Sequence, residues 1–153
     1  QIENARTVSG EPVGDLHVRS SPLKGTDISK TEIPRLIDEL PVIAVAAAMA
    51  AGETCIRDAA ELRVKESDRI TATVELLNAM GAQAEARPDG MLIAGFGGSS
   101  LRAAHVHANG DHRIAMTGMV AGLVARGETK VSGASCIATS FPAFHHILET
   151  LRG

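Results

Sequence analysis

Apolar residues recur every three or four positions in several segments of the chain, which is the spacing that places them on one face of a helix. The first of these segments covers residues 35–51, and we expect Gly52 to end it, because glycine readily adopts the left-handed conformation found after helices. The second covers residues 67–81, where Ser67 can act as the N-cap and Gly81 stands at the C-terminal end. The pattern therefore predicts two helices in the first half of the chain.

The second half repeats this plan of helices separated by short alternating segments. A helix is predicted over residues 111–127, with Asp111 placed as its N-cap, and a closing helix over residues 140–153. Residues 22–34 are rich in turn-forming side chains and are predicted as a loop. Alternation of apolar and polar residues predicts strands and one hairpin, the strands at residues 15–21, 53–59, 104–110 and 128–134 and the hairpin at 82–96.

Two pairs of stretches are alike in sequence, which indicates an internal duplication. The residues AAGETCIRDA at 50–59 match ARGETKVSGA at 125–134, and ELLNAMG at 75–81 matches ILETLRG at 147–153. The copies are separated by about 70–75 residues, which is longer than the repeats of about 20–50 residues that build solenoid proteins. Each copy has the order strand, helix, strand, helix, so we expect an α/β fold that contains two related units.

The composition narrows the class of protein. The 153 residues carry a formal net charge of −3 and include no Trp, no Tyr and three Phe, which argues against a nucleic-acid surface. The longest apolar stretch, residues 40–52, is too short to span a bilayer, and the first residues lack the pattern of a signal peptide. Cys55 and Cys136 are too few for a disulfide framework, so we expect reduced thiols in the core of a cytoplasmic protein.

The stretch LRVKESDR at residues 62–69 combines cations with carboxylates at the start of a predicted helix. Lys65 and Arg69 are four residues apart, so they share a face if this turn is helical, and Glu66 lies between them. One interpretation is an exposed helix start with ordinary surface ion pairs. The other is a cationic site for an anionic substrate, in which Glu66 transfers a proton.

A second charged stretch, DHRIAM at residues 111–116, places His112 and Arg113 in the first turn of a predicted helix. Cations are unfavourable there, because the N-terminus of a helix already carries partial positive charge, so this placement favours a bound anion. The alternative is that Asp111 alone neutralises both residues. Asp38, beside an apolar stretch, also has two interpretations, as a helix-start acid or as a general base at the mouth of a pocket.

The histidines do not indicate a metal site. His105 and His107 alternate on a predicted strand, but no third ligand accompanies them in the sequence. His145 and His146 are adjacent residues of the closing helix, which is typical of a surface or boundary pair. We therefore expect no bound metal.

Three motifs together resemble the EPSP synthase family, namely LRVKESDR at 62–69, DHRIAM at 111–116 and IATSFPAF at 137–144. The similarity runs over essentially the whole chain in the same order, and it includes LHVRSSPLKG at 16–25 and IDELPVIAVAAAMAAGET at 37–54. The resemblance implies a two-domain enzyme in which each domain is an inverted α/β barrel of three βαβαββ units. The chain, which has no initiator Met, is then expected to be a C-terminal fragment of the C-terminal domain, with about two units at residues 15–96 and 104–153.

The resemblance also implies an activity, that of the 3-phosphoshikimate 1-carboxyvinyltransferase of the shikimate pathway, which leads to chorismate and the aromatic amino acids. The enolpyruvyl group of phosphoenolpyruvate passes to the 5-hydroxyl of shikimate 3-phosphate and phosphate is released, without a metal or an organic cofactor. Both substrates are anions, so cations must position them, and the addition and elimination steps need an acid and a base. The inhibitor implied for the phosphoenolpyruvate site is glyphosate.

The same resemblance implies roles for the motif residues. Asp38 corresponds to the catalytic base, and Glu66 to the acid/base at the methylene carbon. Lys65 corresponds to the residue that holds shikimate 3-phosphate. Phosphoenolpyruvate is expected to contact Arg69, His112 and Arg113. Thr139 departs from the family pattern, because some members have a phosphate-contacting lysine at that place.

Two hypotheses remain open at this point. The chain is either part of the transferase, or a stand-alone anion-binding or regulatory module with the same fold. The presence of all the motif residues favours the enzyme. The family's site needs an N-terminal domain as its other wall, and that domain is missing from this sequence. Its absence favours the module for the molecule as it stands, and it predicts that this chain alone is inactive.

Overall fold

The computed structural model describes residues 1–98 and 101–152; Ser99, Ser100 and Gly153, the last residue of the predicted closing helix, lie outside the described residues. The strands are β1 (Ile2–Val8), β2 (Glu11–Leu16), β3 (Asp27–Ile28), β4 (Ala51–Ile56), β5 (Gln83–Arg87), β6 (Gly90–Phe96), β7 (Leu101–Arg102), β8 (His105–His107), β9 (Ala125–Arg126) and β10 (Lys130–Ser132). The helices are α1 (Ile33–Leu36), α2 (Leu40–Met49), α3 (Arg69–Ala79), α4 (His112–Val124) and α5 (Phe144–Arg152), with short 3-10 helices η1 (Ala60–Val64) and η2 (Ala134–Thr139).

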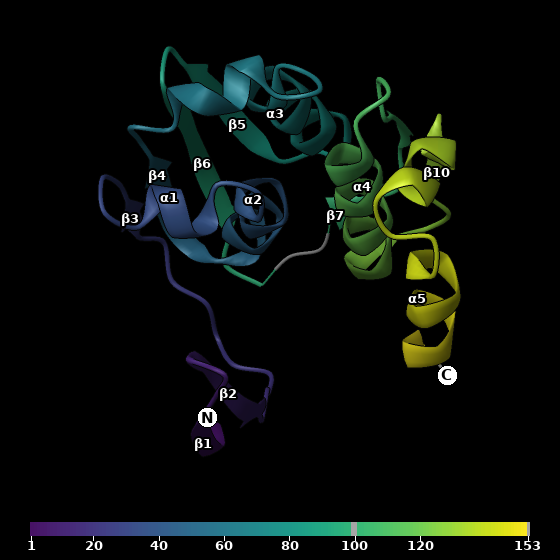
Figure 1. Cartoon of the computed structure of the whole chain (residues 1–153). Coiled ribbons are helices and arrows are strands. Elements are labelled where there is room, and N and C mark those ends of the chain that lie inside the picture. Colours follow the sequence, from purple (N-terminus) through teal and green to yellow (C-terminus); the bar gives the residue numbers. More distant parts are fainter. Residues whose placement is uncertain (99–100, 153) are drawn as a thin grey trace.

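The elements from β3 to β6 form one unit around a four-stranded sheet (Figure 1). The strand order is β3-β4-β6-β5, with β3 parallel to β4 and the other pairs antiparallel. α2 packs against β6 and α3 packs against β5, so apolar side chains of both helices are buried against this sheet. The order β3, α2, β4, α3, β5, β6 is a βαβαββ unit, and the α/β fold class predicted from the sequence is confirmed.

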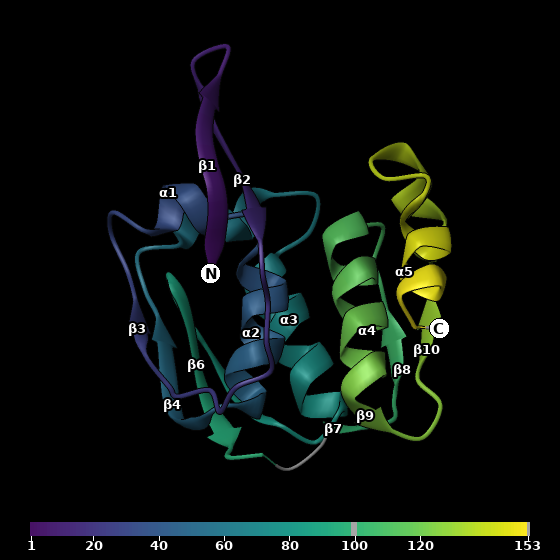
Figure 2. The ribbon, with the colours of Figure 1, turned by 90° about the horizontal axis from the view of Figure 1, so that it is seen from below.

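The elements from β8 to α5 repeat the first four elements of that unit (Figure 2). β8 is followed by α4, and β10 then returns parallel to β8, as β4 returns parallel to β3. The first pair of matching stretches falls at comparable places, because residues 50–59 contain β4, and residues 125–134 contain the short strand β9 and then β10. The sequence similarity between these stretches therefore corresponds to a similarity in structure.

The first strand of the unit differs from the prediction. The sequence predicts a strand at residues 15–21, whereas β2 ends at Leu16 and pairs with β1, and the strand that pairs with β4 is β3, inside the predicted loop. The alternation of Leu16 and Val18 does not mark a buried face, because their exposed fractions are 72% and 90%. β3 has two residues, too few for an alternating pattern, and its place is set by its pairing with Cys55 and Ile56.

The predicted helix at residues 35–51 is interrupted and ends early. α1 stops at Leu36, and α2 begins at Leu40 with Pro41 in its first turn. Proline has no N–H to donate to the preceding turn, so it suits the start of α2 but cannot continue α1. α2 ends before β4, and Gly52 lies inside β4 with a φ of 89° instead of ending the helix.

The caps of the next two helices lie close to their predicted places. The N-cap of α3 is Asp68 rather than Ser67, and its side chain accepts a hydrogen bond from the backbone N–H of Thr71. Asp111 caps α4 as predicted. Gly81 follows α3 with a φ of 85°, which is the left-handed conformation expected after a helix.

The core lies between the sheet of the first unit and the helices α2, α3 and α4, and it consists mainly of aliphatic side chains. Its fully buried members include Leu40, Ile56, Leu62, Ile70, Leu77, Met80, Met91, Ile93, Leu101 and Ile114. Cys55 and Cys136 are free thiols and half-buried, so they lie at the edge of the core and not in its centre. Among the described residues, no helix combines the length and the apolar character needed to cross a membrane.

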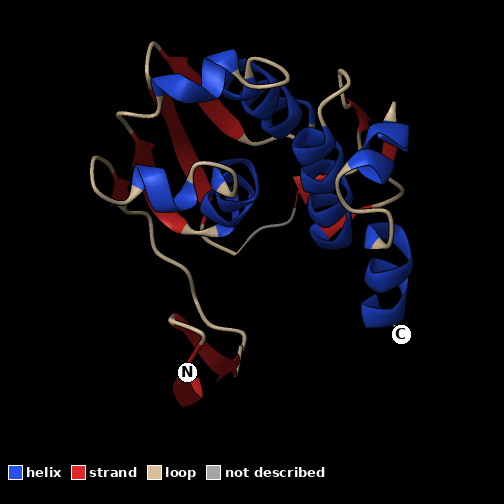
Figure 3. Ribbon diagram, viewed as in Figure 1, coloured by secondary structure: helices blue, strands red, loops and turns tan. Residues whose placement is uncertain are grey.

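The strands β1 and β2 form a hairpin that projects away from the two units (Figures 2 and 3). Nearly all of its side chains are exposed, including the apolar residues Ile2, Val8, Val13 and Leu16. The hairpin therefore takes no part in the core, and the candidate site described below is built by the two units alone.

Candidate active site

The N-termini of α2, α3 and α4 meet at one place, and the three helices pack side by side (Figure 2). Asp38 lies two residues before α2, Asp68 caps α3 and Asp111 caps α4. Backbone N–H groups without helical partners and the partial positive charge of these ends favour anions there. We use the name Arg69 cluster for Asp38, Lys65, Glu66, Arg69, Asp111, His112 and Arg113.

Arg69 lies at the centre of the cluster, and its side chain is 1% exposed. Its guanidinium donates hydrogen bonds to three carboxylates, from Nε to Asp111 at 2.8 Å, from Nη1 to Asp38 at 2.9 Å and from Nη2 to Glu66 at 2.6 Å. Burial lowers the pKa of this guanidinium, but the hydrogen bond and charge of Asp111 and the charge of Glu66 outweigh burial and raise it. Arg69 is therefore a buried and permanently charged donor.

Asp111 is the buried partner of Arg69, with no exposed side-chain surface. Its Oδ2 accepts hydrogen bonds from Arg69 Nε at 2.8 Å and from Ser67 Oγ at 2.9 Å. Its Oδ1 accepts from the backbone N–H of Arg113 at 2.8 Å and from Arg69 Nη2 at 3.3 Å. Burial alone raises the pKa of the Asp111 carboxyl, but the hydrogen bonds from Arg69 and Ser67 outweigh burial and hold the pKa below its ordinary value.

Asp38 faces solvent on one side and cations on the other. Its side chain is 43% exposed, and Oδ1 accepts the hydrogen bond from Arg69. Lys65 Nζ and Arg113 Nη2 each lie 4.0 Å from a carboxylate oxygen of Asp38. One side of the Asp38 carboxylate is therefore held by charge, while the other side stays open to solvent.

Glu66 has a similar arrangement on the other side of Arg69. Its side chain is 48% exposed, and its Oε2 accepts the 2.6 Å hydrogen bond from Arg69. Its other oxygen, Oε1, lies 3.8 Å from Nδ1 of His112, which is the first residue of α4. The two carboxylates predicted to be catalytic are thus the exposed partners of Arg69, and Asp111 is the buried one.

The cations Lys65 and Arg113 already have acidic partners, which sequence reasoning missed. Lys65 Nζ donates to Glu61 Oε1 at 2.5 Å, and this hydrogen bond raises the pKa of Lys65. Arg113 Nη1 donates to Glu39 Oε1 at 2.7 Å. The spacing of four residues between Glu61 and Lys65 is a signal that the sequence contained, whereas Glu39 and Arg113 meet only because α2 and α4 pack together.

The structure thus brings all six predicted site residues into one cluster, and the interpretation of the charged motifs as ordinary surface ion pairs holds only in part. Surface ion pairs do exist, as between Lys65 and Glu61, but the pair of Arg69 and Asp111 is buried.

Thr139 donates its hydroxyl hydrogen to the backbone oxygen of Cys136 within η2. The motif around it reaches the cluster through a cavity of about 240 Å³, which is lined by Asp38, Glu39, Val42, Arg113, Met116, Thr117, Val120, Phe141 and Phe144.

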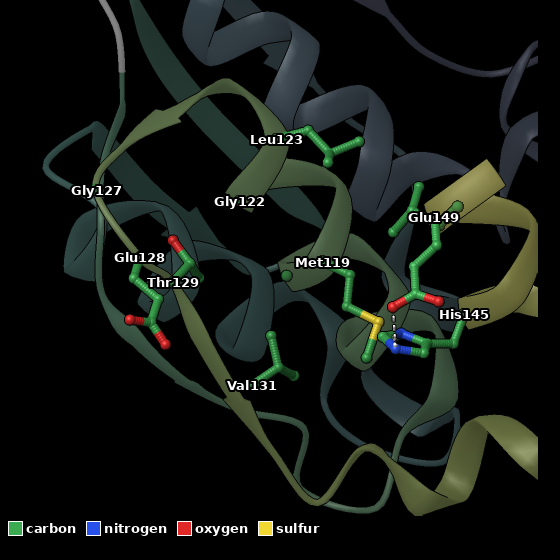
Figure 4. Close-up of a pocket in the computed structure, with 11 residues that line it drawn as sticks. Met119, Gly122, Leu123, Gly127, Glu128, Thr129, Val131, His145 and Glu149 are labelled. Atoms are coloured by element: carbon green, nitrogen blue, oxygen red, sulfur yellow. Dashed lines mark ion pairs between the residues drawn. The ribbon is translucent and has the colours of Figure 1, made fainter. Parts of the chain in front are cut away.

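A larger pocket of about 440 Å³ lies elsewhere, between α4, α5 and the start of β10, and shares no residue with the Arg69 cluster (Figure 4). Figure 4 shows Met119 beside the ring of His145, which pairs with Glu149 at 3.2 Å. The walls are mostly apolar or small residues, among them Leu123 and Val131. None of the described residues that line this pocket is a lysine or an arginine, so they do not provide the convergent cations that an anionic substrate requires.

Arg63, which belongs to the same charged motif, has a structural role instead. Its Nε and Nη2 donate hydrogen bonds to the backbone carbonyls of Pro88 and Arg87, in the turn between β5 and β6. Its Nη1 donates to Asp68 at 2.6 Å. Arg63 therefore ties the hairpin of the first unit to the start of α3.

We expect Asp68→Ala to lower the free energy of unfolding by about 1–2 kcal/mol, because α3 loses its N-cap and Arg63 loses a partner. Burial raises the pKa of Asp68, but hydrogen bonds from Thr71 and the Arg63 charge outweigh it and hold the pKa below 3.8. The carboxylate therefore stabilises the fold at neutral pH, and this contribution is lost as the pH falls through the folded-state pKa. Urea unfolding of the chain at pH 7 and near pH 3 measures both effects.

The matched control for this prediction is Asp27→Ala, which removes an exposed carboxylate paired with Arg57 at 3.5 Å. We expect that variant to lie within about 0.5 kcal/mol of the parent chain. The gap between the parent and Asp68→Ala should narrow as the pH falls; a gap that widens is the opposite of what this capping role predicts.

The fold is α/β, and the Arg69 cluster gathers cations and half-exposed carboxylates at converging helix N-termini, an arrangement that suits an anionic ligand. Residues 2–148 match the family model of EPSP synthase (3-phosphoshikimate 1-carboxyvinyltransferase). The chain is 55% identical over 151 residues to a 3-phosphoshikimate 1-carboxyvinyltransferase of Roseiflexus castenholzii, covering 99% of the chain and 35% of that protein. It is 57% identical over 143 residues to the one of Herpetosiphon aurantiacus, covering 94% and 33%. A solved structure of EPSP synthase from Acinetobacter baumannii matches with a TM-score of 0.92 at 39% identity, over 98% of this chain and 35% of that chain.

The chain belongs to the EPSP synthase family. The resemblance seen in its motifs is therefore confirmed, and its fold is that of the matching part of the solved EPSP synthase structure. The chain spans about a third of the length of the curated relatives and of the solved chain that it matches.

Proposed function

We propose that this chain supplies one wall of the active site of a 3-phosphoshikimate 1-carboxyvinyltransferase. The reaction transfers the enolpyruvyl group of phosphoenolpyruvate to the 5-hydroxyl of shikimate 3-phosphate and releases phosphate. The observation that carries the proposal is the Arg69 cluster. In this cluster, basic residues from two separate motifs surround two half-exposed carboxylates, those of Asp38 and Glu66. Family membership supports the same reaction.

The cations of the cluster suit two anionic substrates. Lys65 holds the phosphate of shikimate 3-phosphate, and His112 and Arg113 hold phosphoenolpyruvate beside the N-terminus of α4. Arg69 is buried beneath Asp38 and Glu66 and adds its positive charge to the site. The described residues accept hydrogen bonds from four of its five N–H groups, and its side chain is 1% exposed, so Arg69 acts on phosphoenolpyruvate through its charge, and a direct contact requires the side chain to move.

The two exposed carboxylates divide the proton transfers between them. Asp38 accepts the proton of the 5-hydroxyl as that oxygen attacks phosphoenolpyruvate, and Glu66 donates a proton to the methylene carbon. Glu66 then removes a proton from the resulting methyl group as phosphate leaves, which restores the double bond. Both residues are fixed by Arg69 on one side and face solvent on the other, which supports proton transfer by both, and the family resemblance of the motifs supports the assignment of base and acid.

The wall formed by this chain belongs, in this proposal, to the C-terminal domain of a larger enzyme. The chain contributes two units, near residues 27–96 and 104–153, to the C-terminal domain of the enzyme, and an N-terminal domain supplies the opposite wall. Glyphosate carries a carboxylate and a phosphonate, so it competes with phosphoenolpyruvate for the same cations. An enzyme of this pathway with reduced, half-buried thiols fits the cytoplasm.

We expect Glu66→Gln, in a full-length enzyme that carries this segment, to lower kcat by on the order of 10² while KM for both substrates changes by much less. Glutamine keeps the size of the side chain and can still accept a hydrogen bond from Arg69, but it cannot carry a proton to carbon. Steady-state assays of phosphate release with phosphoenolpyruvate and shikimate 3-phosphate give both constants.

The matched control is Glu75→Gln, which changes the same atoms on an exposed position of α3. We expect its kcat to equal that of the parent enzyme. If Glu66→Gln retains a normal kcat, Glu66 is only an ion-pair partner of Arg69. If the parent enzyme itself releases no phosphate from the two substrates, the proposed reaction is wrong.

A further inference from the structure

The buried end of the Arg69 cluster is held by side chains that no step of the proposed reaction uses. Asp111 has no exposed surface, so its carboxylate cannot touch a substrate. Both of its oxygens are occupied, Oδ1 by Arg113 N–H and Arg69, and Oδ2 by Arg69 and the hydroxyl of Ser67. A carboxylate with four donors in fixed positions has little freedom to rotate, and it holds its partner equally firmly.

Arg69 passes this constraint on to the two exposed carboxylates. The guanidinium is planar and rigid, so fixing Nε and Nη2 on Asp111 also fixes the directions in which the remaining N–H groups point. One of these directions ends on Asp38 at 2.9 Å and another on Glu66 at 2.6 Å. The separation of the proposed base and the proposed acid is therefore set by where Asp111 holds the arginine.

Ser67 joins the two units of the fold at this point. It lies just before α3, and its hydroxyl donates to Asp111, which caps α4 and is 44 residues away. The N-cap of α3 is Asp68, so the hydroxyl of Ser67 is available for this contact with Asp111. The Ser67 hydroxyl therefore links the N-termini of α3 and α4 and does not cap α3.

We propose that Asp111 and Ser67 are positioning residues, which set the distance and orientation between Asp38 and Glu66 by holding the buried guanidinium of Arg69. Neither residue touches the reacting atoms. The inference rests on the proposed function for its kinetic consequence, but the fixed geometry of Arg69 is a property that is measured separately.

The test uses Ser67→Ala and Ser67→Thr in the full-length enzyme that carries this segment. We expect Ser67→Ala to lower kcat about tenfold with KM within about twofold, because a small misplacement of reacting groups reduces the rate more than binding. Ser67→Thr keeps the hydroxyl and should restore most of kcat. Asp111→Asn removes the charge and should lower kcat by on the order of 10².

The control is Ser132→Ala, which removes a hydroxyl hydrogen-bonded to His107 in another part of the fold and should leave kcat unchanged. A kcat of Ser67→Ala equal to that of the parent enzyme overturns the proposal. So does a Ser67→Thr variant that is no better than Ser67→Ala, or a loss that appears in KM alone.

A second readout separates this inference from the proposed reaction. In the same protein labelled with ¹⁵N-arginine, the Nε–H of Arg69 should give a slowly exchanging NMR signal, because it is buried and bonded to Asp111. We expect its hydrogen exchange to be at least about tenfold faster in Ser67→Ala and unchanged in Ser132→Ala. If the parent enzyme lacks transferase activity, the proposed function fails while this measurement still decides the positioning role. Equal exchange in all three proteins overturns it.

Discussion

The 153-residue chain on its own is expected to show no detectable enolpyruvyl transfer, although it carries the complete Arg69 cluster. Asp38 and Glu66 are 43% and 48% exposed, so water reaches the two carboxylates that should act on a shielded substrate. Holding two reactants in position and away from water supplies about 7–11 kcal/mol of the barrier reduction in well-oriented reactions. A site with one wall loses most of this, which corresponds to a rate lower by about 10⁵–10⁸.

The measurement is phosphate release from phosphoenolpyruvate and shikimate 3-phosphate by the chain alone and by a full-length enzyme that carries it. Calorimetric binding of phosphate or phosphoenolpyruvate to the chain alone is the control, because it shows that the cations are folded and accessible. Turnover by the isolated chain shows that one wall is sufficient and contradicts the two-wall proposal. Anion binding by both proteins without turnover by either favours the anion-binding or regulatory module.

Arg69→Ala is expected to lower the free energy of unfolding of the chain by about 3–5 kcal/mol, the range found when one partner of a buried ion pair is removed. Arg69 is 1% exposed, and Asp111 has no exposed surface, so the truncation leaves a carboxylate buried without its cation. Ser67 and the backbone N–H of Arg113 remain as donors, but they carry no charge. Urea unfolding at pH 7 measures the loss.

The loss of stability in Arg69→Ala should depend on pH. In the parent chain the pKa of Asp111 is held below its ordinary value, so the pair stabilises the fold at neutral pH and this contribution is lost as the pH falls through the folded-state pKa. Without Arg69, burial raises that pKa, and the variant is most destabilised when the carboxyl must be charged. The difference between parent and variant should therefore be smaller near pH 4 than at pH 7.

Arg57→Ala is the matched control, since it removes an arginine that is 55% exposed and paired with Asp27 at 3.5 Å. We expect that variant to lose no more than about 1 kcal/mol. Equal losses for the two arginine variants mean that the Arg69 pair behaves as a surface ion pair, which was the simpler interpretation of the LRVKESDR motif.

Helices α3 and α4 were predictable from the sequence because the forces that start and end them are local. Asp111 bonds to the N–H of Arg113, two residues away, and Gly81 takes the left-handed conformation directly after α3. The predicted cap of α3, Ser67, was wrong by only one residue, because Ser67 and Asp68 are both residues that favour the N-cap position. The interruption between α1 and α2 also has a local cause, in Pro41.

The short strands were less predictable because their pairing comes from distant residues. β3 is a strand only because Asp27 and Ile28 lie beside Cys55 and Ile56, and two residues carry no periodic pattern. The alternation at Leu16 and Val18 imitates a buried strand, yet both side chains are exposed. Alternation shows that one face is apolar, but whether anything covers that face depends on the rest of the fold.

For the site, the sequence by itself determined which residues are present and the family to which their motifs belong. It could not determine that Arg69, predicted to hold phosphoenolpyruvate, is buried against Asp111 while Asp38 and Glu66 remain half-exposed. Arg69 and Asp111 are 42 residues apart, and their contact exists only because the N-termini of α3 and α4 are packed together. Only the tertiary structure decided which carboxylates are buried and which are exposed. The burial and hydrogen bonding of these carboxylates depend on the packing of α2, α3 and α4, which are far apart in the sequence.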